Sequence, residues 1–178
     1  MNCFGKTLKR LATAMAGLGM VAVSLGVSAA PAQAAGGDLN CILDTIDVTF
    51  QPPLSPTRQA TTATGRGPLL LCSSPNGRYS RLTRATITGI GTAKFQPPIY
   101  ASVTGKAQFK WNTGEVSDFT FDVNTDPLSP KFEAETTSGP LLGDTVLPTG
   151  PVVFVPKVDL LCGCVNGFTA ADIAVNFA

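Results

Sequence analysis

Apolar and polar residues alternate with a period of two along most of the chain after residue 40. Clear examples are Ile46, Val48 and Phe50, separated by Asp47 and Thr49. This alternation is typical of β-strands with one buried face, and the runs are rich in Val, Ile, Thr and Phe, which favour strands. The pattern predicts strands at 41–51, 57–66, 80–93, 99–111, 116–124, 131–137, 144–156 and 168–177.

Proline and glycine separate these predicted strands, which is the spacing of antiparallel sheets. Seven or eight short strands predict an all-β fold, a single antiparallel β-sandwich or barrel. The best hairpin joins 99–111 to 116–124, because Gly114 in the intervening turn can adopt positive φ. The one candidate helical turn lies near 169–172. A repeat of Phe-Gln-Pro-Pro at residues 50 and 95 marks either an old duplication or two similar strand ends.

The N-terminal segment has the features of an export signal. Lys6, Lys9 and Arg10 precede an apolar stretch at 11–27, and Ala32-Gln33-Ala34 offers the small residues of a signal-peptidase site. We therefore predict a signal peptide at 1–34, a short lead-in at 35–40 and a single β domain at 41–178. The expected location is secreted and extracellular, with no membrane span in the mature chain.

Charge and composition narrow the function classes. All 12 acidic residues but only ten of the 13 basic ones follow Ala34, so residues 35–178 carry a net charge of −2. A nucleic-acid partner is not expected, because it requires a basic face. The chain has no His, which excludes Ser-His and Cys-His nucleophile pairs and His-based catalytic zinc sites. No cofactor motif is present, and no catalytic residue is predicted.

Four cysteines follow the signal segment: Cys41, Cys72, Cys162 and Cys164. An even number in an exported chain predicts two disulfides. Cys162 and Cys164 are separated by one residue, so a bond between them would close a tight ring. We expect each of them to bond to Cys41 or Cys72, in either of the two possible pairings. A thiolate metal site is the alternative.

The segment from Asp122 resembles a calcium loop in its spacing. Asp122, Asn124 and Asp126 occupy positions one, three and five, and Glu133 occupies position twelve. Position six, where such loops need Gly, is Pro127, whose φ is fixed near −65°. The alternatives are a calcium site and a β-turn rich in Asp and Asn.

Trp111 is the single tryptophan and ends a predicted strand beside a turn. An exposed Trp there could bind a ligand by stacking on a sugar ring. Its alternation places it on the same face as Val103 and Phe109, which favours the core.

Two further groups of charged residues can each be interpreted in two ways, as a functional site or as a solvent-exposed strand face. Paired carboxylates at Asp118 and Asp122, and at Glu133 and Glu135, have spacing that a glycosidase would tolerate. Five arginines could meet an anionic cell-wall polymer; they are Arg58, Arg66, Arg78, Arg81 and Arg84. Acidic and basic residues on exposed strand faces also serve solubility alone.

Several short motifs resemble a group of uncharacterised secreted all-β proteins of actinobacteria. They are Pro52-Pro53-Leu54, Gly105, Trp111-Asn112-Thr113-Gly114, Ser117, the segment 138–144, and a closing strand with Cys164 and Gly167. The resemblance covers most of the mature chain and implies export and a β fold, but no activity and no functional residues.

The sequence thus favours an exported non-catalytic binding or structural module of the extracellular space or cell envelope. Its partner is unknown; a cell-wall polymer, a saccharide or another exported protein fits. The alternative is a secreted hydrolase that uses a carboxylate pair. A convergent cleft with one carboxyl of raised pKa would distinguish the hydrolase.

Overall fold

The computed structural model describes residues 37–57, 60–171 and 173–178. The predicted signal peptide at 1–34 lies outside these ranges. No helix in the described ranges is long and apolar enough to cross a membrane. The strands are β1 (Leu39–Leu43), β2 (Ile46–Leu54), β3 (Thr61–Ser73), β4 (Ala85–Gln96), β5 (Tyr100–Trp111), β6 (Val116–Asn124), β7 (Lys131–Ser138), β8 (Thr145–Pro148), β9 (Val153–Asp159), β10 (Cys164–Ala171) and β11 (Ile173–Phe177).

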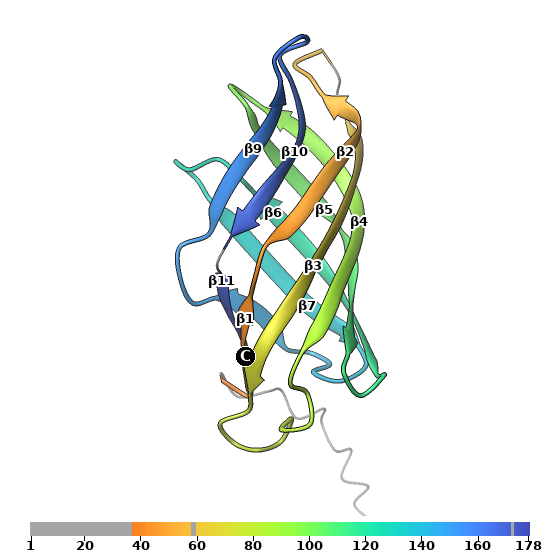
Figure 1. Cartoon of the computed structure of the whole chain (residues 1–178), viewed down its shortest axis with the longest axis vertical. Helices are drawn as coiled ribbons and strands as arrows, with labels where there is room; N and C mark the ends of the chain where they lie inside the picture. Colours follow the sequence, from red (N-terminus) through yellow and green to blue (C-terminus); the bar gives the residue numbers. More distant parts are fainter. Residues whose placement is uncertain (1–36, 58–59, 172) are drawn as a thin grey trace, which may run out of the picture.

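Eight of these strands close into an antiparallel barrel (Figure 1). β3 to β7 pair in chain order, β7 pairs with β8, β8 with β11, β11 with β1, and β1 returns to β3. β2, β10 and β9 extend the sheet from the first half of β3. The prediction of an all-β antiparallel fold is confirmed, and the closure identifies it as a barrel.

Three predicted strands are each divided in two. The run 41–51 becomes β1 and β2, and 144–156 becomes β8 and β9. The run 168–177 begins earlier, at Cys164, and becomes β10 and β11. The expected helical turn near 169–172 is wrong over its described residues, because Thr169–Ala171 pair with Val153–Val155 of β9. Tertiary pairing determines the backbone there.

The predicted hairpin is confirmed as β5 and β6. Val103 lies opposite Val123, and Phe109 lies opposite Ser117. The Gly114 N–H donates to the carbonyl oxygen of Trp111 at 3.0 Å. Gly114 has φ of 86°, a conformation that glycine adopts without steric cost.

The four cysteines form two disulfides, but the expected pairing is wrong. Cys41 bonds to Cys72, and Cys162 bonds to Cys164. β1 and β3 are neighbours in the sheet, so the first bond joins adjacent strands. The second, the tip disulfide, lies in the β9–β10 turn at the opposite end of the barrel from β1 (Figure 1). Two disulfides indicate an oxidising, extracytoplasmic environment.

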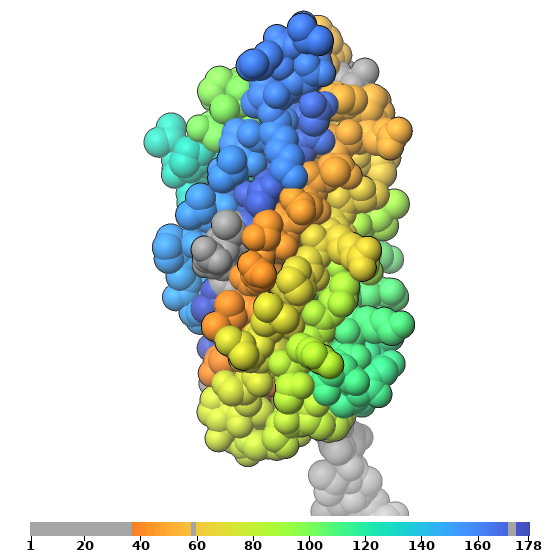
Figure 2. Space-filling model, in the orientation of Figure 1, coloured from red at the N-terminus to blue at the C-terminus, as the bar shows by residue number. Residues whose placement is uncertain are grey.

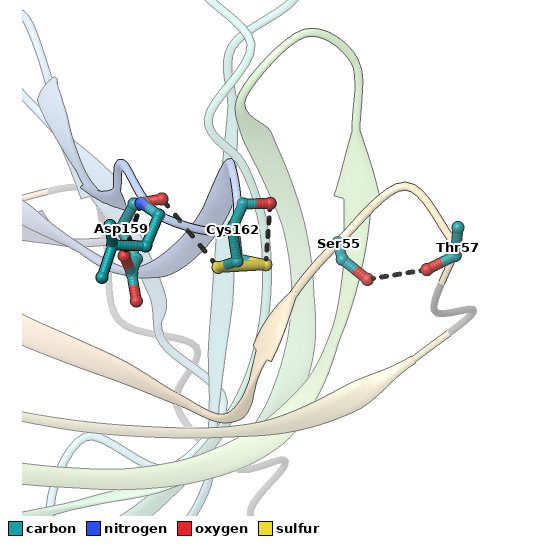
Figure 3. Close-up of a disulfide and its surroundings, with 6 residues drawn as sticks. Ser55, Thr57, Asp159 and Cys162 are labelled. Atoms are coloured by element: carbon teal, nitrogen blue, oxygen red, sulfur yellow. Dashed lines mark hydrogen bonds between the residues drawn. A yellow bond between two sulfur atoms is a disulfide. The ribbon is translucent and has the colours of Figure 1, made fainter.

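The tip disulfide lies beside Asp159 and near the loop of Ser55 and Thr57 (Figure 3). The Leu161 N–H donates to the Asp159 carboxylate at 2.9 Å. Leu160 and Leu161 are 92% and 99% exposed at this turn.

Candidate binding site

The inside of the barrel is filled by two layers of apolar side chains. The layer near the C-terminal end includes Leu39, Leu82, Phe109, Trp111 and Phe177. The other layer lies under β2, β10 and the far halves of β3 to β5, and includes Phe50 and Phe168. Ile46, Phe121 and Phe154 pack against both layers. Between them lies a cavity of about 90 Å³, the barrel cavity.

Small residues on one wall leave this volume unfilled. Ala63 and Gly65 of β3, Gly89 of β4 and Ala107 of β5 line the cavity. The opposite wall is aromatic, with Phe119, Phe121, Phe132, Phe154 and Phe168. An eight-stranded barrel has room for side chains or for one small ligand. Here small residues on three adjacent strands leave part of that room open.

The barrel cavity has no polar side chain in its lining: its residues are Val, Leu, Ile, Phe, Ala and Gly only. A water molecule needs two to four polar partners to occupy a buried site, so an apolar cavity of this kind stays dry. The molecule that fits it is therefore apolar where it contacts the protein.

One side of the barrel beside this cavity has unpaired strand edges. In the described chain, β9 pairs with β10 alone, and Lys131–Glu133 pair with β6 alone. β7 and β9 therefore face each other across an unpaired edge. Phe132 of β7 and Phe154 of β9 line the cavity yet are only half-buried. Both rings are therefore partly accessible to solvent and lie on strands with an unpaired edge.

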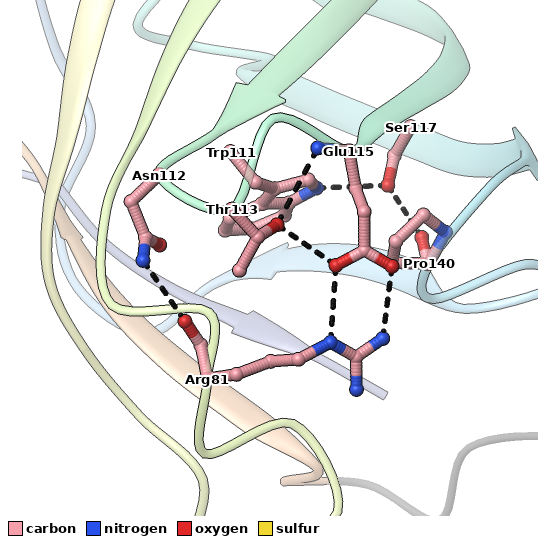
Figure 4. Close-up of polar contacts among 7 residues, drawn as sticks. All are labelled: Arg81, Trp111, Asn112, Thr113, Glu115, Ser117 and Pro140. Carbon is pink, nitrogen blue, oxygen red and sulfur yellow. Dashed lines mark hydrogen bonds and ion pairs between the residues drawn. The ribbon is translucent and has the colours of Figure 1, made fainter.

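The C-terminal end of the barrel, in contrast, is closed by a polar network beneath Trp111 (Figure 4). The Trp111 indole N–H donates to the Ser117 hydroxyl at 2.9 Å, and Ser117 donates to the Pro140 carbonyl. Arg81 forms two hydrogen bonds of 3.0 Å to the Glu115 carboxylate. These bonds hold the β5–β6 turn against the loops on either side.

Trp111 is 2% exposed and packs against Phe109 at a tilted angle and against Phe177 edge-on. The structure thus places Trp111 in the core, as its alternation with Val103 and Phe109 favoured, and leaves no ring face free to stack on a sugar. Its polar atom is satisfied by Ser117, as buried indole nitrogens usually require.

The four predicted calcium ligands do not converge on one point. The Asn124 side-chain oxygen accepts the Asp126 N–H at 3.1 Å, and Asp126 accepts the N–H of Leu128 at 2.9 Å. Asp122 and Glu133 both contact the Lys131 amine, at 2.7 and 3.1 Å. Within the described ranges, no group of three or more His, Cys, Asp or Glu is placed to hold a metal ion. The segment has the local bonding of a turn rich in Asp and Asn.

The paired carboxylates lie on the outer wall of the barrel, away from the cavity. Hydrogen bonds from Ser138 and then Gln108 lower the pKa of Asp118. Arg81 and Thr113 lower the pKa of Glu115 in the same way. A general acid needs the opposite shift, toward neutrality. Glu133 and Glu135 are exposed on β7.

The barrel cavity itself was not expected from the sequence. The available signal was the run of Ala and Gly at inward-facing positions of the strands that became β3, β4 and β5. Such residues weaken a strand unless the space they leave is used.

Comparison of the chain with protein-family models, curated proteins and solved structures finds no match in any of the three.

Proposed function

We propose that this protein is a secreted, non-catalytic binding protein that holds a small apolar molecule inside its barrel. The observation that carries the proposal is the barrel cavity, which has a wholly apolar lining and lies next to an unpaired edge of the sheet. Ligand sites are usually concave and mostly apolar. The two disulfides and the export signal predicted from the sequence support a role outside the cytoplasm.

The size of the cavity restricts the ligand. An engineered apolar cavity of about 150 Å³ binds benzene or xenon, and the barrel cavity is smaller, at about 90 Å³. A short alkyl segment fits this volume. A longer ligand would leave its remaining part, including any polar group, at the β7–β9 edge beside Phe132 and Phe154.

The hydrolase alternative has less support. The cavity offers no acid, base or nucleophile, and the carboxyl groups with a shifted pKa, Asp47, Glu115 and Asp118, are all shifted downward. Lowered carboxyl pKa values keep these groups ionised at neutral pH, where they cannot donate a proton.

Methyl NMR of the mature protein tests the proposal with xenon and a series of linear alcohols from butanol to octanol as probes. We expect saturable shifts of the Val48, Val103 and Val146 methyl signals, which line the cavity. The methyl groups of Leu160 and Leu161 are exposed and report non-specific association. Shifts of these two leucines without shifts inside the barrel would overturn the proposal.

Gly65→Val should abolish the shifts, because the added methyl groups fill the space beside Gly65. The matched control is Thr62→Val, which places a valine at an exposed position of the same strand by exchanging a hydroxyl for a methyl group. Ala63→Val provides a second filled cavity if the first variant folds poorly. Unchanged alcohol binding in both filled variants would show that the ligand lies elsewhere.

A further inference from the structure

β3, β4 and β5 run side by side in the barrel wall (Figure 2). A second concave surface, the outer groove, lies on the outside of these strands. It encloses about 640 Å³. Three of its lining residues are cations: Arg66 from β3, Arg84 from the residue just before β4, and Lys110 from β5. No acidic residue lines it.

The sheet register brings these cations together. Arg66 lies opposite Thr88, and Lys110 lies opposite Thr86. Arg84 is two residues before Thr86 and so projects from the same face of the sheet. Strand spacing of about 4.8 Å and a rise of about 3.3 Å per residue place the three cations roughly 8–14 Å from one another at their Cα atoms.

None of the three cations has an anionic partner within the described part of the chain. The ion pairs found there use Arg78, Arg81, Lys131 and Lys157 instead. The arginine group noted in the sequence is therefore divided: Arg78 and Arg81 are paired, whereas Arg66 and Arg84 line the outer groove. Arg58 lies outside the described residues.

Acids on the strands beside the groove already have partners. Asp47 lies opposite Arg66, but its carboxylate accepts hydrogen bonds from Lys157 and Thr169. Asp118 lies opposite Gln108 and accepts from Gln108 and Ser138. The positive charge of the groove therefore remains available to a ligand.

The groove also offers polar and aliphatic contacts between its charges. Thr86 and Thr88 are exposed, and each hydroxyl can donate and accept a hydrogen bond. Leu70 and Val116 are 37% and 39% exposed at its margins. Its one aromatic residue, Trp111, is buried, so no ring is free for base stacking, on which single-stranded nucleic-acid binding depends.

We propose that the outer groove binds a polyanionic saccharide through Arg66, Arg84 and Lys110. The three cations pair with carboxylate, sulfate or phosphate groups spaced along the polymer, and the threonine hydroxyls bond to sugar hydroxyls. This site is separate from the barrel cavity and goes beyond the binding of an apolar molecule.

Binding is measured by calorimetry or biolayer interferometry at about 50 and 200 mM salt, with dextran sulfate, polygalacturonate, neutral dextran and a poly-dT oligonucleotide as probes. At least one anionic saccharide should bind, and its affinity should fall as salt rises, because ion pairs at an exposed surface are screened. The preferred polymer identifies sulfate or carboxylate as the better group. Neutral dextran should not bind.

Arg66→Gln, Arg84→Gln and Lys110→Gln should each weaken binding roughly two- to fivefold, the range of exposed ion pairs. The matched control is Lys94→Gln, which removes one exposed charge from the same strand β4 outside the groove. Gly65→Val should leave polyanion binding unchanged.

Three results would overturn the proposal. Absence of polyanion binding at 50 mM salt excludes the site. An equal loss in Lys94→Gln would show that net charge alone is responsible. Binding of poly-dT as tight as that of the anionic saccharides would replace a saccharide site with a nucleic-acid surface.

Discussion

Replacing either of two barrel glycines with alanine is expected to change stability in opposite directions. Gly65→Ala should stabilise the protein, whereas Gly91→Ala should destabilise it. Both glycines lie in the middle of neighbouring strands, β3 and β4. The difference is in what an added methyl group would contact.

At Gly65 the new Cβ would lie 3.5 Å from Val48 Cγ2 and 4.0 Å from Ile46 Cγ2, which is ordinary van der Waals contact. Burial of one methyl group contributes about 0.8 kcal/mol. Loss of glycine's freedom in the unfolded chain adds about 0.4–1 kcal/mol. We therefore expect Gly65→Ala to raise the free energy of unfolding by about 1–2 kcal/mol.

At Gly91 the new Cβ would overlap the carbonyl oxygen of Thr104 and lie 3.1 Å from the Gly105 Cα. These are backbone atoms of β5, so they can move away only if β4 and β5 separate. Such overpacking costs about 1–3 kcal/mol. We expect Gly91→Ala to lower the free energy of unfolding by that amount.

Urea unfolding followed by the fluorescence of the single tryptophan measures both changes. Gly150→Ala is the control for glycine's unfolded-state freedom, because its Cβ would meet open space. It should gain only about 0.4–1 kcal/mol. A destabilised Gly65→Ala, or a Gly91→Ala as stable as the wild type, would refute the packing described for β3, β4 and β5.

Three further outcomes are expected. Ser117→Ala should lower the free energy of unfolding by about 1–3 kcal/mol in urea titrations, because it leaves the buried Trp111 indole N–H and the half-buried Pro140 carbonyl without this partner. A loss under 0.5 kcal/mol would contradict the network. Replacing Cys41 and Cys72 with Ala should lower the free energy of unfolding by about 3–4 kcal/mol, whereas replacing the two cysteines of the tip disulfide should lower it by only about 1–2 kcal/mol. The reason is that the entropy of loop closure grows with the length of the closed loop. Equal losses in denaturant titrations would contradict this. The lowered pKa of Asp118 stabilises the folded state at pH values above the unfolded pKa of 3.8, and this stabilisation is lost as the pH falls below that value. Asp118→Asn should therefore make the free energy of unfolding depend less on pH in that range. An unchanged pH dependence would show that the shift is absent.

Local rules account for what the sequence predicted correctly. The alternation of Val103 to Trp111, that of Phe119 to Val123, and the glycine in the turn between them are properties of adjacent residues. Together they predicted the β5–β6 hairpin. The same alternation placed Phe109 and Trp111 on one face. That face is buried in the barrel.

The tertiary structure alone decided the rest, because it depends on which distant segments meet. Closure requires Leu39–Leu43 to pair with Ile173–Phe177, and nothing in either segment specifies the other. The partner of Cys41 follows from the pairing of β1 with β3, not from ring size. The barrel cavity arises only when the small residues of three strands face the phenylalanines of four others across a closed barrel. The sequence by itself therefore determined that the chain forms antiparallel β-strands, since alternation and turn chemistry act over a few residues. The barrel, the disulfide partners and the cavity were decided by contacts between segments that lie far apart in the sequence, in one case at opposite ends of the domain.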